Sequence, residues 1–310
     1  MQRGPVRRCV RGAVVHSGDA LSLTWPVVAL VLVGAVLHAA WNALVKSSGD
    51  KELDTALVHF LGAVVALPLL VAVGLPPVGA WPYICASLVV HIGYYIALAG
   101  AYKHGDLGLT YPIMRGSAPL LVALSSGLLL GESPSPMAWA GILGITAGVA
   151  LVGLSQFSDA LHHRKALGFA LANAAIIACY TVIDGKGVRL TVAHGHAAIT
   201  YVMVMFVLDG LPYPTLVWWR RSPSARQAIL AYARQRWPLA ALGGAASIGS
   251  YAIALWAMTR APVASVAALR ETSVLFAALL GTWLLKERFG RQRALGTLVI
   301  VAGVMALRLA

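Results

Sequence analysis

The chain is dominated by long apolar segments separated by short polar breaks. About ten segments are each about 18–24 residues long, and about 20 apolar residues suffice for a helix to cross a bilayer. Only 11% of the residues are charged, whereas an ordinary soluble domain carries about 25%. The segments take up most of the 310 residues. The sequence therefore predicts an all-α integral membrane protein without a sizeable soluble domain.

The breaks between the segments are rich in turn-forming and charged residues, as in "GESPSP" and "WRRSPSARQ". They divide the chain into a polar, Arg-rich tail at 1–24, a first unit at 25–155, a connecting loop at 156–165 and a second unit at 166–310. The spans predicted in the first unit are 25–45, 55–74, 81–102, 107–130 and 137–155. Those predicted in the second unit are 166–185, 197–219, 237–259, 263–285 and 292–309.

The formal net charge of +13 would indicate a nucleic-acid partner if the basic residues formed patches among aromatic residues. Nearly all Lys and Arg residues instead lie in the breaks between spans, which is typical of charges that set membrane topology. The cysteines, Cys9, Cys85 and Cys179, match neither a metal-ligand spacing nor a disulfide framework. We therefore expect a lipid bilayer around the chain, no nucleic acid, and no metal or cofactor.

The two units repeat each other. The segment from Arg115, "RGSAPLLVALSSGLLLGESPSPMAWAGILGITAGVALVGL", aligns without a gap with that from Arg270, "RETSVLFAALLGTWLLKERFGRQRALGTLVIVAGVMALRL". Upstream, "YYIALAGAYK" matches "YAIALWAMTR". The aligned pairs include Arg115 with Arg270, Glu132 with Glu287, Gly141 with Gly296 and Gly148 with Gly303. Because each unit has an odd number of spans, the copies must cross the membrane in opposite senses, which predicts inverted repeats about an in-plane pseudo-two-fold axis.

Over residues 25–309, the chain resembles the EamA family of ten-helix permeases in the drug/metabolite transporter superfamily. The resemblance rests on "HAAWNALVK" in the first span, the Gly-Glu and Lys-Glu steps at Glu132 and Glu287, and the paired terminal spans. It implies a basket of helices around a central cavity. The first, third, fourth, sixth, eighth and ninth spans would line this cavity, and the fifth and tenth would brace the outside. Small multidrug-resistance relatives carry a glutamate in their first helix, but this chain has His38 and Asn42 there.

Arg270 and Glu271 stand side by side within the predicted ninth span. A charge near the middle of a bilayer costs about 2.5–3.5 kcal/mol on insertion scales, and adjacent helical residues point too far apart to pair with each other. Intramembrane ionisable residues usually face a cavity or a partner. We expect Glu271 to face the cavity, with Arg115 as its counter-charge. The alternative is a fixed ion pair that only holds the fourth and ninth spans together.

Other polar and aromatic side chains form stripes along the spans. His38, Asn42 and Lys46 are spaced i, i+4, i+8, which keeps them on one helical face. In the sixth span Asn173, Tyr180 and Asp184 share a face, and Asp184 is interpreted as a solvated charge near the helix end. The alternatives are satisfied packing for His38 and interfacial anchoring for the aromatic residues. The predicted substrate-binding residues are His38, Trp41, Asn42, Tyr95, Tyr111, Arg115, Tyr180, Trp256, Arg270 and Glu271.

Two further features are interpreted as structural. Gly144 and Gly148 form a small-xxx-small pair, which predicts close helix packing in the fifth span. Glu132 and Glu287 precede the fifth and tenth spans, where the positive end of the following helix favours a carboxylate.

An intramembrane enzyme would need a metal-binding helix, a nucleophile elbow or paired carboxylates, and the sequence shows no such constellation. A scaffold or channel subunit would not explain inverted repeats with charges inside the spans. We therefore predict a non-enzymatic secondary transporter, an exporter of small metabolites such as amino acids, that works by alternating access. Glu271 is the candidate for proton coupling, because a carboxylate removed from water can titrate near neutral pH.

The expected location is a bacterial cytoplasmic membrane, with the protein as a monomer or homodimer. The resemblance implies that both termini are cytoplasmic. The positive-inside rule favours the opposite orientation, because the segment from Arg220 to Arg236 carries five arginines. Both orientations stay open.

Overall fold

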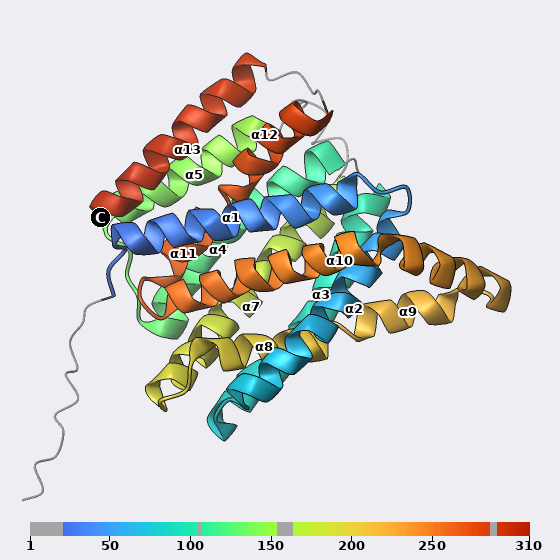
Figure 1. The fold of residues 1–310 in the computed structure, drawn as a ribbon. Helices are drawn as coiled ribbons and strands as arrows, with labels where there is room; N and C mark the ends of the chain where they lie inside the picture. Colours follow the sequence, from blue (N-terminus) through green and yellow to red (C-terminus); the bar gives the residue numbers. More distant parts are fainter. Residues whose placement is uncertain (1–20, 105–106, 154–163, 286–289) are drawn as a thin grey trace, which may run out of the picture.

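The computed structural model describes residues 21–104, 107–153, 164–285 and 290–310, and within these ranges it is helical without strands. Ten of its helical stretches are long and apolar enough to cross a membrane, which confirms the all-α prediction (Figure 1). The first half contains α1 (Trp25–Lys46), α2 (Lys51–Val73), η1 (Val78–Ala80), α3 (Trp81–His104), α4 (Leu107–Leu130) and α5 (Pro136–Gly153). The second half contains α7 (Arg164–Ala193), α8 (Ala198–Asp209), α9 (Pro212–Arg220), α10 (Pro223–Met258), α11 (Val263–Arg270), α12 (Ser273–Leu285) and α13 (Arg291–Leu309).

Local capping explains where several helices begin. Asp50 accepts a hydrogen bond from the Leu53 amide, so α2 begins at Lys51, four residues before the predicted span. Ser222 caps α10 in the same way, and Pro223 at the first helical position has no N–H that needs a partner. The segment "WRRSPSARQ", predicted as a break, therefore contains a helix start, and α10 extends 36 residues to Met258.

Two predicted spans are interrupted. The seventh divides into α8 and α9 just before Pro212, because proline has no backbone N–H to continue the hydrogen bonds of α8. The ninth divides into α11 and α12 at Glu271 and Thr272. The Thr272 hydroxyl donates to the Leu269 carbonyl at 2.7 Å, and the local backbone bonds tighten to i→i−3. Such side-chain competition for backbone acceptors favours a helix end.

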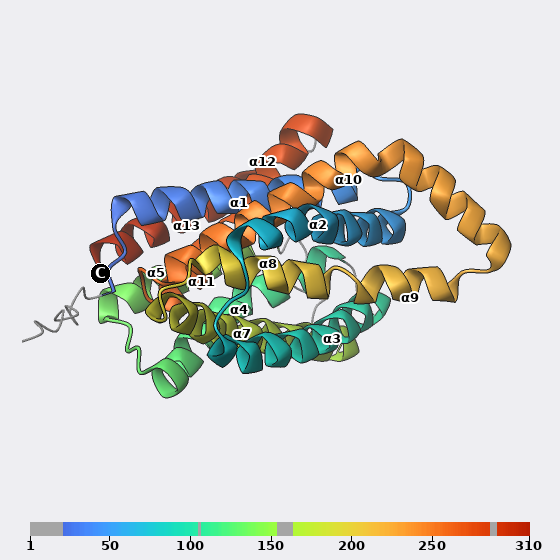
Figure 2. The same cartoon turned by 60° about the horizontal axis from the view of Figure 1, so that its bottom comes forward.

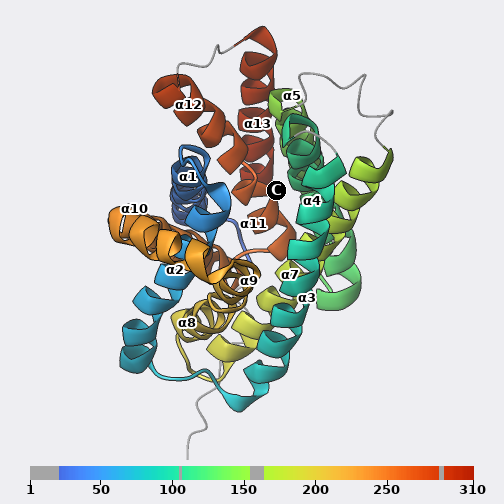
Figure 3. The ribbon, with the colours of Figure 1, turned by 90° about the vertical axis from the view of Figure 1, so that its right-hand side faces the viewer.

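The helices pack as two groups with α11 between them. In Figure 3, α1, α2 and α10 lie on one side and α3, α4 and α7 on the other. Contacts along the chain agree, since α1 and α2 pack against α10, while α3 and α4 pack against α7. Helix α11 contacts both α4 and α1, and the turned view in Figure 2 shows it among the bundled helices. Residues of the two repeats are therefore mixed within each group.

Helices α5 and α13 lie side by side at the edge of the molecule (Figure 1). A Cβ on Gly148 would lie 2.8 Å from the Gly296 carbonyl, and a Cβ on Gly141 would lie 2.8 Å from the Gly303 carbonyl. Gly141 corresponds to Gly296 and Gly148 to Gly303 in the repeat alignment. Each glycine of α5 therefore contacts the α13 counterpart of the other α5 glycine. This is the pattern of a two-fold contact between like surfaces. Close packing at Gly148 is confirmed, and the reciprocal pattern fits inverted repeats.

Glu132 was predicted to be favoured by the positive end of the following helix, α5, but its carboxylate binds elsewhere. Ser135 caps α5 by accepting from the Ala138 amide. Glu132 instead accepts from the Val263 amide at the start of α11, at 2.8 Å, and pairs with Arg189 of α7 at 2.5 Å. The chain fold brings a helix start of the second repeat to this carboxylate, so Glu132 joins the two repeats. Its counterpart Glu287 lies outside the described residues, as do residues 1–20 of the predicted tail and 156–163 of the predicted connecting loop.

Candidate functional site

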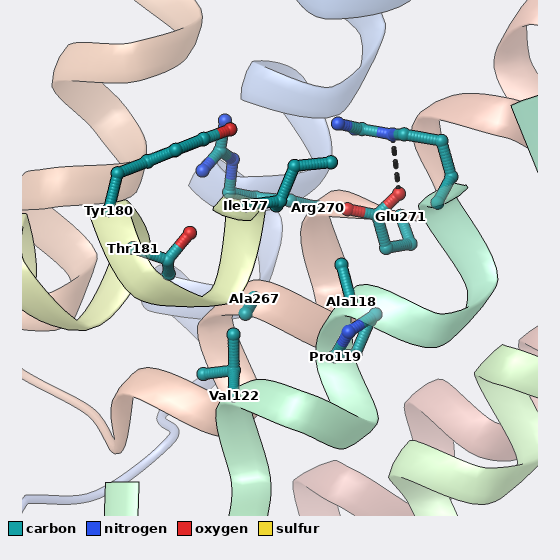
Figure 4. A pocket seen from close by; sticks show the side chains of 10 residues that line it. Ala118, Pro119, Val122, Ile177, Tyr180, Thr181, Ala267, Arg270 and Glu271 are labelled. Carbon is teal, nitrogen blue, oxygen red and sulfur yellow. Dashed lines mark ion pairs between the residues drawn. The ribbon is translucent and has the colours of Figure 1, made fainter. Parts of the chain in front are cut away.

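A small pocket lies between α4, α7 and the break that separates α11 from α12. Its polar side chains are Arg115, Tyr180, Thr181, Arg270 and Glu271. Figure 4 shows Tyr180, Arg270 and Glu271 together in the upper part of the pocket, above four small or apolar residues. These four are Ala118, Pro119, Val122 and Ala267. The pocket is therefore polar at one end and apolar at the other.

The predicted partnership of Arg115 and Glu271 is present in the structure. Arg115 Nε lies 2.7 Å from Glu271 Oε2, and the two residues are only 8% and 5% exposed. Within the described residues neither atom has an aligned hydrogen-bond partner, because the Nε–H bond does not point at the oxygen. The contact is an ion pair without the directed hydrogen bond that would strengthen it.

His38 extends this pair towards α1. Arg115 Nη2 lies 3.5 Å from His38 Nε2, and Trp41 Nε1 lies 3.4 Å from His38 Nδ1. The rings of His38 and Trp41 also meet edge to face, with centroids 5.4 Å apart. A neutral imidazole has only one acceptor nitrogen, so Trp41 and Arg115 compete for it.

Arg270 is the second guanidinium of the pocket. Its guanidinium lies over the Tyr251 ring, 5.3 Å from the ring centroid. Within the described parts of the chain no carboxylate forms an ion pair with Arg270. The pocket thus contains two guanidinium groups and one carboxylate, which leaves one positive charge without an acidic partner.

The structure brings some of the predicted residues together and places others elsewhere. Tyr180 lines the pocket and stacks on His91 of α3, with ring centroids 4.4 Å apart. Tyr111 lies one turn before Arg115 and within electrostatic range of Arg115 and Glu271. Together with His38 and Trp41, these residues surround the pocket or its ion pair.

Asn42, Tyr95 and Trp256 do not line the pocket. The Asn42 amide donates to the His38 carbonyl of its own helix at 2.7 Å. The Tyr95 hydroxyl donates to Asp209 of α8 at 3.3 Å, and the Trp256 ring carries the Arg260 guanidinium at 5.8 Å. Each of these side chains therefore has a partner outside the pocket lining, and a role for them in binding stays a prediction.

Asp184 is not a solvated charge, contrary to the prediction. Helix α7 continues to Ala193, so Asp184 lies well inside it and is 0% exposed. Gly187, one turn later, packs on Tyr201: a Cβ on this glycine would lie 2.6 Å from the tyrosine ring. Gly187 therefore permits close approach of α8.

Sequence reasoning missed several residues around the site. Thr181 and the small residues of α4 and α11 carry no distinctive signal, because apolar and hydroxyl side chains are common in membrane helices. Tyr251 had a usable signal: the repeat alignment places it on Tyr94, and Tyr94 lies within electrostatic range of Arg115. Each repeat thus places a tyrosine near its arginine.

The family comparison decides the identity of the chain. The model of the EamA-like transporter family matches residues 25–154 and 164–309. The chain belongs to the EamA-like transporter family. It is therefore an integral membrane protein of the drug/metabolite transporter superfamily, whose members are transporters of small molecules rather than enzymes.

A solved crystal structure supports the fold independently. It superposes with a TM-score of 0.70 at 19% sequence identity, and the match covers 92% of this chain and 96% of the other. At this identity the likeness shows the fold alone. A search of curated protein sequences found no significant match.

Proposed function

We propose that this EamA-family protein transports small carboxylate-bearing metabolites, amino acids in the first place, by alternating access. The observation that carries the proposal is Arg270, which lines a buried pocket and has no ion-pair partner in the described residues. Arg270 itself is only partly buried, so its guanidinium keeps its charge in the pocket and is suited to an oppositely charged ligand. A guanidinium can hold a carboxylate through two parallel hydrogen bonds.

The neighbouring charges favour a zwitterion over a simple anion. Arg115 and Glu271 already pair at 2.7 Å, so Arg270 is the cation available for a substrate carboxylate. The Glu271 carboxylate lies next to it in the same pocket and is a suitable acceptor for a substrate ammonium group. The apolar residues Ala118, Val122 and Ala267 lie below these groups (Figure 4). They would accommodate a small apolar side chain.

The break in the ninth span supports a transport mechanism at this point. Substrate sites of secondary transporters are typically formed by interrupted helices at the interface between inverted repeats. Glu271 lies at the interruption between α11 and α12, and Arg115 belongs to the other repeat. The empty space in the pocket holds about one water molecule, so an amino acid requires the surrounding helices to move apart.

Glu271 is proposed to couple this movement to protons. Taking up a proton would neutralise its carboxylate and release Arg115 from the ion pair. The two groups belong to different repeats, so a movement of one repeat against the other would separate them once the charge of Glu271 is lost.

Counterflow into proteoliposomes tests the proposal. Vesicles containing the purified protein are loaded with an unlabelled amino acid, and uptake of the same labelled amino acid is followed at two pH values. We expect labelled amino acids with small apolar side chains to accumulate, and the Arg270→Gln variant to lose this accumulation while remaining folded. Absence of counterflow for all amino acids, in vesicles that contain folded protein, would reject the amino-acid proposal.

The direction of transport and the membrane that contains the protein are also part of the proposal. We propose export across a bacterial cytoplasmic membrane, in line with the family resemblance. Cells that overproduce the protein should release more of the transported amino acid into the medium than cells that overproduce the Arg270→Gln variant. Equal release from both would argue against export.

A further inference from the structure

Asp184 is a second buried acid, separate from the pocket. It is 0% exposed, and both of its oxygens accept hydrogen bonds from tyrosines. Tyr201 of α8 donates to Oδ1 at 2.8 Å, and Tyr251 of α10 donates to Oδ2. In the described ranges, no Lys, Arg or His forms an ion pair with it. An ionised carboxylate that lacks an ion-pair partner is costly in an apolar interior.

The surroundings of Asp184 come from several helices. Ser87 and His91 of α3 interact with its carboxylate, and Tyr83 of the same helix lies near Tyr201. On α7 itself, Tyr180 lies one turn before Asp184, while Lys186 is exposed. Helix α11 contributes Arg270 and α4 contributes Arg115, both within range of Tyr180. The adjoining η1 contains only Val78, Gly79 and Ala80, which do not titrate.

Tyr251 connects this acid to the pocket. Its hydroxyl donates to Asp184, and its ring lies under the Arg270 guanidinium at 5.3 Å. A second connection runs through Tyr180, which lines the pocket and stacks on His91. Asp184 therefore contacts the residue that holds Arg270 in place, although it does not line the pocket itself.

We propose that Asp184 is a proton-binding site outside the substrate pocket and that its protonation controls Arg270 through Tyr251. This inference rests on the proposed function, because Arg270 is the residue expected to bind the substrate carboxylate. When Asp184 takes up a proton from water, one of its oxygens forms an O–H bond with that proton. In the opposite conformation of the transporter, this O–H bond breaks and the proton returns to water.

The ionised and protonated forms of Asp184 differ as hydrogen-bond acceptors for Tyr251. An ionised carboxylate accepts from both tyrosines, which holds the Tyr251 ring beneath Arg270. A protonated carboxyl group is a weaker acceptor, and its own O–H is a donor. Protonation therefore loosens Tyr251, and Arg270 can leave the ring and move towards a carboxylate in the pocket. Asp184 acts as a positioning residue whose charge is set by pH.

Infrared difference spectroscopy on the purified full-length protein tests proton binding without any need for transport. Spectra are compared between high and low pH, and the C=O stretching band of a protonated buried carboxyl group is followed. We expect an Asp184→Asn variant to lose one such band and Glu271→Gln to retain it. Tyr251→Phe, which keeps the ring but removes the hydroxyl, should shift the band. Retention of every band in Asp184→Asn, with no shift in Tyr251→Phe, would overturn the proposal.

Counterflow then tests the control of Arg270. In Asp184→Asn, which is permanently neutral, we expect the pH profile of substrate binding to change, while the pH dependence contributed by Glu271 remains. Tyr201→Phe removes a hydroxyl from the same carboxylate without touching Arg270, so it should move the pH profile of substrate binding while keeping the contribution of Asp184 to it. Tyr251→Phe breaks the connection between Asp184 and Arg270, so it should remove that contribution. If the wild-type protein shows no counterflow, the proposed function fails, and the infrared bands still decide whether Asp184 binds a proton. An unchanged pH profile in a folded Asp184→Asn protein would reject the control of Arg270.

Discussion

Arg115 of α4 and Glu271 of the α11–α12 break approach within 2.7 Å across the two repeats, yet the Arg115 Nε–H bond does not point at the carboxylate. Each side chain needs the other, because an isolated buried charge is expensive. Because the two side chains belong to different repeats, a movement of one repeat against the other would separate them.

Replacing Glu271 with Gln separates a transport role from a structural one. Removing one partner of a buried ion pair costs about 3–5 kcal/mol when the remaining charge has no other contact. His38 lies 3.5 Å from Arg115 and substrate can supply a second contact, so we expect a smaller loss. The folded variant should lose counterflow and its pH dependence. Thermal unfolding in detergent measures the loss of stability, and uptake into vesicles at several pH values measures counterflow and its pH dependence.

An exchanged pair provides the control. If the ion pair is only structural, the double variant Arg115→Glu with Glu271→Arg should recover both folding and transport. We expect it to recover folding at most, because the exchange moves the carboxylate away from Arg270. Full recovery of counterflow would contradict a specific role for Glu271.

His38 should influence the affinity for substrate through Arg115. A hydrogen bond to a charged group contributes about 1.5–3 kcal/mol, and at 3.5 Å this one is at the weak end. We expect His38→Phe to raise the apparent KM about tenfold, which corresponds to about 1.4 kcal/mol. Trp41→Phe removes the competing donor and leaves His38 to accept from Arg115, so the KM should stay the same or fall. An equal rise in both variants would indicate a packing defect instead.

The Glu132–Arg189 contact should hold one end of the protein closed. Glu132→Gln removes the charge but keeps an oxygen for the Val263 amide. We expect a thiol placed at Ala261, which is buried next to this contact, to react faster with a membrane-impermeant reagent in this variant. The rate of labelling on that side of the membrane is the measurement.

Arg221→Gln is the matched control for this labelling. It breaks a 2.6 Å ion pair with Glu52, but both partners are largely solvated, and exposed pairs contribute only about 0–1 kcal/mol. The Ala261 thiol should therefore react at an unchanged rate. Similar acceleration by both variants would show that labelling reports general loosening.

The α5–α13 contact should be needed for folding and not for substrate binding. A Cβ on Gly148 would lie 2.8 Å from both the Gly296 carbonyl oxygen and the Ile300 nitrogen, and backbone atoms cannot move aside easily. Overpacking of this kind costs about 1–3 kcal/mol or more. We expect Gly148→Leu to lower the Tm and the yield, with an unchanged KM in the protein that folds.

Gly168 offers a control within α7. A Cβ there meets no other atom within 4 Å, and alanine is favoured over glycine inside a helix by about 1 kcal/mol. Gly168→Ala should therefore keep or raise the Tm. A change in KM for Gly148→Leu would show that the α5–α13 pair also shapes the pocket.

Much of the architecture can be read from the sequence because its causes are local or periodic. The length and hydropathy of the segments identify ten spans, and the aligned Arg115 and Arg270 reveal the repeat. The cost of charge in a membrane also predicts that Glu271 needs a partner, and the equivalent arginine is the one that the structure provides. These inferences need no knowledge of which helices are neighbours.

The remaining features depend on neighbours that are distant in the sequence. Asp184 is buried because α8 and α10 bring two tyrosine hydroxyls to it, and Glu132 faces α11 because the repeats meet there. Tyr95 likewise bonds Asp209 of α8 and does not line the pocket. The sequence by itself determined the membrane spans, the inverted repeat and the charged pair. Only the tertiary structure decided which polar side chains share a pocket, because a polar group inside a membrane points towards whichever partner the packed helices supply.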